Sequence, residues 1–83
     1  MSTKAKCLAL AKKHNMEIEI GASLDEYDIC IPEGFTLEDY EGARTGLSAS
    51  GYDNAKEMWK GCYEDLQTCV AYQPWFKIPE EWK

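Results

Sequence analysis

Apolar residues in the first fifteen positions recur at the three- and four-residue spacing of an amphipathic helix. The apolar stripe consists of Cys7, Leu8, Leu10 and Ala11, with lysines around it. Ser2 or Thr3 is suitably placed to cap the N-terminus, and Asn15 is a residue type that often ends a helix in the left-handed conformation. The pattern therefore predicts a helix over residues 2–15.

After residue 15 the period of the pattern shortens to two, which is typical of half-buried strands. Residues 16–20 and 27–31 both alternate, and a six-residue segment with glycine and serine joins them. An antiparallel hairpin is therefore predicted over residues 16–31. One of its faces carries Met16, Ile18, Ile20, Tyr27, Ile29 and Ile31. The other carries Glu17, Glu19, Asp28 and Cys30.

Residues 32–52 have a weaker pattern. Pro32 ends the second strand, and residues 32–35 have the composition of a turn. Residues 36–39 fit either one capped helical turn or an acidic loop. Residues 44–49 are predicted to form a third strand, which Gly46 weakens.

Helical spacing returns in residues 53–71, which are predicted to be a five-turn amphipathic helix capped by Asp53 or Asn54. The apolar stripe consists of Ala55, Trp59, Cys62, Leu66, Cys69 and Val70. Gly61 inside this helix costs up to ~1 kcal/mol relative to alanine, so it indicates a close contact between helix and sheet.

The last twelve residues, 72–83, contain two prolines and are expected to form an extended tail. Its Trp75, Phe76 and Trp82 either pack back on a small core or anchor in a partner. The element order predicts one α+β domain in two layers. A small antiparallel sheet of two or three strands packs against two helices, in the order α-β-β-(β)-α.

Charge is strongly segregated along the chain. The first fifteen residues carry four lysines and no acid, whereas residues 16–41 carry nine carboxylates and no Lys or Arg, and the net charge is −6. If both helices cover the apolar face of the sheet, Glu17, Glu19 and Asp28 remain on the open face. Such a face is either a solubilising surface or one that docks on a basic protein surface or imitates nucleic-acid phosphates.

A divalent-cation site is a further alternative for these carboxylates. Neither residues 25–28 nor residues 38–41 have the spacing or the central glycine of a calcium loop. The four cysteines form no C-x-x-C pair, so no zinc site is expected, and they are interpreted as free thiols. We therefore expect no metal and no cofactor.

Other function classes receive little support. The chain contains no P-loop, G-x-S-x-G, G-x-G-x-x-G or H-E-x-x-H motif, so no catalytic activity is expected. Direct nucleic-acid binding is disfavoured because the last helix begins with Asp53-Asn54-Ala55-Lys56-Glu57 and the pI is about 4.6. No apolar run reaches the ~18–20 residues that a membrane span needs, and no signal peptide is recognised, so a cytoplasmic protein is expected.

Residues 43–69 resemble the second half of short uncharacterised proteins of tailed bacteriophages. Trp59, Leu66 and Cys69 match a helix of the form W-x(6)-L that ends near a Cys, and Tyr52-Asp53 matches its start. The resemblance implies a phage origin and an α-β-β-β-α order, but no activity. Those proteins often have His or Cys in the third strand, where this chain has Gly46-Leu47-Ser48.

The sequence thus predicts a small, acidic, non-catalytic protein that docks on a host or phage protein with a basic surface. The predicted contact residues are Glu17, Glu19, Asp28, Trp75, Phe76 and Trp82. One alternative is a small-ligand or metal binder with a pocket lined by Trp59, Cys62, Tyr63 and Trp75. A second alternative is a structural protein that forms homo-oligomers through its tail.

Overall fold

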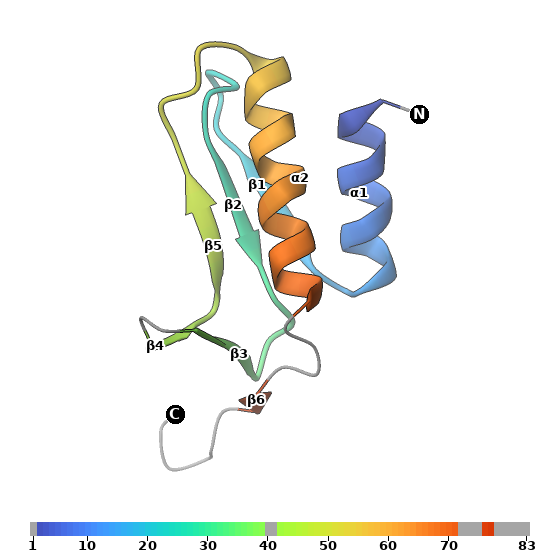
Figure 1. The fold of residues 1–83 in the computed structure, drawn as a ribbon, viewed down its shortest axis with the longest axis vertical. Coiled ribbons are helices and arrows are strands. Elements are labelled where there is room, and N and C mark those ends of the chain that lie inside the picture. The colour runs from blue at the N-terminus through green and yellow to red at the C-terminus, as the bar shows by residue number, and fades with distance from the viewer. Residues whose placement is uncertain (1, 40–41, 72–75, 78–83) are drawn as a thin grey trace.

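A computed structural model describes residues 2–39, 42–71 and 76–77, with side chains for residues 2–36 and 45–71. Two helices pack on one face of a small antiparallel sheet (Figure 1). This arrangement confirms the α+β class and the α-β-β-β-α order of the two helices and the three strands of the main sheet. The elements are α1 (Thr3–Lys13), β1 (Glu17–Ile20), β2 (Tyr27–Cys30), β3 (Phe35–Asp39), β4 (Gly42–Arg44), β5 (Gly46–Ala49), α2 (Ala55–Ala71) and β6 (Phe76–Lys77).

Helix α1 begins and ends where its capping residues predict. The Ser2 hydroxyl accepts a hydrogen bond from the Ala5 N–H at 3.2 Å, and Asn15 follows the helix with a φ of 57°. Cys7 and Ala11 are buried, but Leu8 is 48% exposed. Leu8 was therefore wrongly placed in the apolar stripe, because only the residues that face α2 and the sheet are covered.

Helix α2 packs against β2 and β5 of the main sheet. The Asn54 side chain caps it by accepting a hydrogen bond from the Glu57 N–H at 2.9 Å. Four residues of α2 are fully buried: Met58, Cys62, Leu66 and Cys69. Three of these, Cys62, Leu66 and Cys69, belong to the predicted apolar stripe, which missed Met58. The other stripe residues, Ala55, Trp59 and Val70, are only half-buried.

The main sheet has the strand order β1-β2-β5, with β2 in the centre. Its register pairs Ile18 with Ile29 and Glu19 with Asp28, so the predicted hairpin is confirmed. The third strand is also confirmed, although it starts at Gly46 rather than at residue 44. Residues with apolar side chains on the helix-covered face include the buried Met16, Tyr27, Ile29 and Ile31.

A second small sheet, with the order β4-β3-β6, lies at the end of the molecule opposite the N-terminus (Figure 1). The predicted turn is present, since the Phe35 N–H donates to the Pro32 carbonyl at 3.2 Å. The helical turn or acidic loop expected at residues 36–39 is wrong, because this segment is a strand. Residues 37–39 pair with residues 42–44 of β4, whereas Phe35 and Thr36 pair with Lys77 and Phe76 of β6, some forty positions away.

A network of two tyrosines and an aspartate joins the sheet to α2. The hydroxyl of the buried Tyr27 donates to the Asp65 carboxylate. The Tyr52 hydroxyl lies 3.4 Å from the Tyr27 hydroxyl. A Cβ atom at Gly61 would overlap the Tyr52 ring, reaching within 2.7 Å of its Cζ. Gly61 therefore marks a close contact as predicted, but the contacting group is the Tyr52 side chain rather than the sheet.

Candidate protein-binding face

The face of the main sheet that is turned away from both helices is called the outer face here. Its side chains come from Glu17 and Glu19 of β1, Glu26, Asp28 and Cys30 in and before β2, and Ser48 and Ser50 in and after β5, where Gly46 adds only a bare backbone position. They lie in rows across the strands because Glu19 pairs with Asp28, which pairs with Ser48. Alternation along the strands thus gathers carboxylates from separate segments on one surface.

Glu17, Glu19 and Asp28 are all exposed and share the outer face as predicted. Their position alone does not test the prediction that they contact a partner. Trp75 and Trp82 lie outside the described residues, and Phe76 is described only as backbone in β6. The extended tail predicted over residues 72–83 lies almost entirely outside the described part of the chain.

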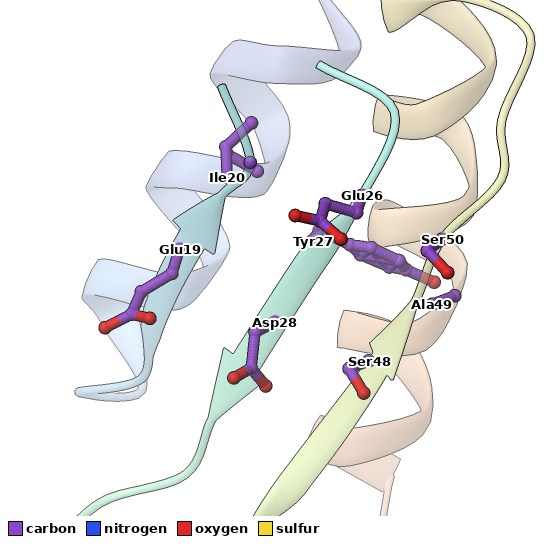
Figure 2. Close-up of a pocket in the computed structure, with 9 residues that line it drawn as sticks. Glu19, Ile20, Glu26, Tyr27, Asp28, Ser48, Ala49 and Ser50 are labelled. Atoms are coloured by element: carbon purple, nitrogen blue, oxygen red, sulfur yellow. The ribbon is translucent and has the colours of Figure 1, made fainter. Parts of the chain in front are cut away.

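A shallow hollow of ≈ 520 Å³ opens on the outer face near the hairpin loop (Figure 2). Carboxylates line it on one side and small residues on the other, and its lining consists of Glu19, Ile20, Gly21, Glu26, Tyr27, Asp28, Ser48, Ala49 and Ser50. Gly21 leaves room for the Glu26 side chain, whose Cδ would lie 2.7 Å from a Cβ at that position. The hollow is therefore lined by three carboxylates and two serines, together with the apolar Ile20 and Ala49.

The pKa of the Cys30 thiol reflects the negative charge of the outer face. Burial raises the pKa of its thiol above the ordinary value, and the carboxylates of Asp28, Glu19 and Glu17 raise it further. A thiolate at this position would be repelled by all three. The outer face therefore favours cations and disfavours anions.

The sequence missed three residues of this site: Glu26, Ser48 and Ser50. Glu26 was assigned to the loop between the two predicted strands. Extending the alternation of β2 by one step, from Asp28 back to residue 26, places Glu26 on the same face. The two serines could be placed only once the register of β5 against β2 was known.

The alternative pocket of Trp59, Cys62, Tyr63 and Trp75 is not assembled by the described residues. Cys62 is fully buried, and Trp59 lies under the Lys4 ammonium at 5.8 Å. Tyr63 instead lines a hollow of ≈ 260 Å³ beside α1, together with Lys6, Ala9, Leu10 and Lys13. Trp75 lies outside the described residues.

Within the described ranges, no group of three or more His, Cys, Asp or Glu side chains has the geometry to hold a metal ion. Three cysteines, Cys7, Cys62 and Cys69, are buried, and burial raises the pKa of each thiol. His14 ends α1, where a positive charge suits the helix dipole.

No family model, no curated protein and no solved structure matches the chain. Among the described helices, none combines the length and the apolar composition needed to cross a membrane.

Proposed function

We propose that this protein is a non-catalytic binding protein and that its outer face docks on a basic surface of a protein partner. One observation carries the proposal: Glu17, Glu19 and Asp28 lie together on the sheet face that neither helix covers. A solubilising function alone would not need the carboxylates to be gathered on one face around a hollow. Complementary charge speeds the encounter of two proteins and selects between partners.

The resemblance of residues 43–69 to tailed-phage proteins supports a further part of the proposal. A phage-encoded protein of this kind acts in the cytoplasm of an infected bacterium, where its partner is a host or phage protein. The lysines of α1 and the carboxylates of the outer face belong to opposite layers of the molecule, so a basic partner is attracted to only one side of it.

The proposal is tested with a basic probe, an acetylated and amidated octapeptide of alternating lysine and threonine. Its affinity for the wild type and for two double variants is measured by isothermal titration calorimetry. E17Q/E19Q neutralises two carboxylates of the outer face, and E57Q/E64Q neutralises two exposed carboxylates of α2. Both variants change the net charge equally and by the same chemistry.

We expect E17Q/E19Q to weaken binding by about three- to tenfold, since each exposed charge contributes roughly 0.2–1 kcal/mol. E57Q/E64Q is expected to change the affinity by less than about twofold, because its carboxylates lie on a helix of the other layer. Equal losses in the two variants would show that only the net charge matters and would refute docking on the outer face.

A further inference from the structure

Strand β5 forms one edge of the main sheet. Within the described residues it pairs only with β2, and no described helix or strand lies beyond it (Figure 1). Its sequence, Gly46-Leu47-Ser48-Ala49, contains no charge and no proline, which are two of the features that protect exposed edges in other proteins. On the opposite edge, β1 carries Glu17 and Glu19 and packs against α1.

The register shows which backbone groups of β5 point away from the sheet. The Ile31 N–H donates to the Thr45 carbonyl at 2.9 Å, and in an antiparallel pair the hydrogen-bonded positions alternate. Residues 45, 47 and 49 therefore face β2. The N–H and C=O groups of Gly46 and Ser48 face the free edge, where an additional strand would find them.

The outer-face side chains of β5 leave a clear path from this edge to the carboxylates. Gly46, Ser48 and Ser50 are small, and Ser48 stands between the edge and Asp28 in the same row. A residue of an added strand opposite Ser48 would lie two strand spacings from Asp28, about 10 Å. The four-carbon stem of a lysine together with the Asp28 side chain covers that distance.

Resting on the proposed function, we propose that the partner segment is an extended basic peptide that adds antiparallel to β5 as a fourth strand. Lys or Arg occupies every second position, opposite Gly46, Ser48 and Ser50. These cationic side chains reach over the serines into the hollow lined by Glu19, Glu26 and Asp28. The backbone ladder gives affinity, and the alternating charge gives specificity.

Antiparallel addition continues the pattern of the β1-β2-β5 sheet and is slightly more stable per residue than parallel addition. In this arrangement the residues opposite Gly46 and Ser48 are both the cationic ones and the ones whose N–H groups bond to β5. The intervening residues point their N–H groups away from β5. This difference can be tested without altering any charge.

Two N-methylated forms of the alternating lysine–threonine octapeptide are compared with the parent peptide. Methylation of the lysine amides removes the donors that face β5, whereas methylation of the threonine amides removes donors that face solvent. We expect about tenfold or greater loss of affinity for the lysine-methylated form, because several backbone hydrogen bonds are lost together. The threonine-methylated form should bind within about threefold of the parent.

A pair of protein variants tests the same edge from the other side. Ser48→Pro removes an outward-facing N–H and no bond to β2, and an edge strand tolerates proline at such a position. Ser48→Ala keeps the N–H and serves as its control, with circular dichroism to show that both variants are folded. We expect the parent peptide to bind S48P about tenfold more weakly than S48A, because both variants lack the Ser48 hydroxyl and only S48P lacks the backbone donor.

The outcomes separate this inference from the proposed function. If both methylated peptides bind equally well while E17Q/E19Q still weakens them, the outer face binds cations without strand addition and only the present inference is overturned. If methylation of the threonine amides is the more damaging, antiparallel addition is wrong. If no basic peptide binds the wild type, both proposals fail.

Discussion

At the scale of single residues, Tyr27 connects the centre of the sheet to α2. Its hydroxyl donates to Asp65, so the Tyr52 hydroxyl at 3.4 Å is left to donate to Tyr27. The two rings lie 5.8 Å apart at an angle of 56°. Burial and the Asp65 carboxylate both raise the pKa of Tyr27 well above its ordinary range. The residue therefore acts as a neutral donor that fixes the position of α2.

Replacing Tyr27 with phenylalanine keeps the buried ring and removes this donor. We expect Y27F to lower the free energy of unfolding by about 1.5–3 kcal/mol, the range for a hydrogen bond to a charged group. Y52F, which removes only the longer contact, should lower it by less than about 1 kcal/mol. Urea denaturation followed by circular dichroism gives both values. A Y52F effect as large as that of Y27F would contradict the assigned order of donors.

At the scale of elements, α2 depends on its first turn. Asn54 accepts the only side-chain capping bond described for this helix, from the Glu57 N–H. Replacing Asn54 with alanine leaves that donor to solvent and is expected to lower the free energy of unfolding by about 1 kcal/mol. Asn54→Asp keeps an accepting oxygen and should retain the wild-type value within a few tenths of a kcal/mol. Equal destabilisation by the two substitutions, measured by urea denaturation, would show that the cap contributes nothing.

The two helices and the central strands follow from local sequence patterns, because their 3.6- and 2-residue periods match the faces that they bury. Leu8 and Met58 were misassigned since the exact rotation of a helix depends on its neighbours. Strand β6 could not be predicted, because its pairing with β3 joins segments some forty positions apart. The glycine that was expected to weaken β5 instead permits close strand pairing: a Cβ at Gly46 would lie 2.8 Å from the Ile29 carbonyl carbon.

The candidate site was predictable in part for the same reason. Glu17, Glu19 and Asp28 were placed on one face by alternation alone. Ser48 and Ser50 complete the hollow from another strand, and only tertiary pairing brings them there.

At the scale of the whole molecule, we expect the folded state to lose stability at alkaline pH. Burial raises the pKa of Cys62 strongly, that of Cys69 to about 11 from 9.0, and that of Tyr27 as well. These groups keep their protons in the folded protein at pH values where the unfolded chain has lost them. Unfolding then releases protons, so the stability that they contribute is complete below about pH 9 and falls as the pH rises further.

We therefore expect the free energy of unfolding to be flat from pH 7 to 8 and to fall above pH 9, with up to about 1.4 kcal/mol per pH unit from each group. Urea denaturation at one-unit pH steps measures this slope. Replacing Cys69 with alanine removes one titrating group, so the fall of the unfolding free energy with pH should become shallower by up to about 1.4 kcal/mol per pH unit. This expectation holds whatever the effect of C69A on stability at pH 7. An unchanged slope in C69A would show that Cys69 ionises equally in both states.

The distribution of charge across the two layers gives the whole molecule its proposed function. Helix α1 carries exposed Lys4, Lys6, Lys12 and Lys13, and the outer face of the sheet carries the carboxylates. Under the proposed function, a partner with a basic segment is drawn to the sheet, and we expect its docking to depend on the ionic strength.

The most direct test is the salt dependence of peptide binding, with the alternating lysine–threonine octapeptide titrated at several salt concentrations between about 50 and 200 mM, a range over which screening becomes strong. If the outer face is the docking surface, the wild type loses affinity steeply as salt rises, E57Q/E64Q follows the same slope, and E17Q/E19Q has a clearly shallower one. Three equal slopes, or a wild-type affinity that does not change with salt, would contradict docking through the carboxylates of the outer face.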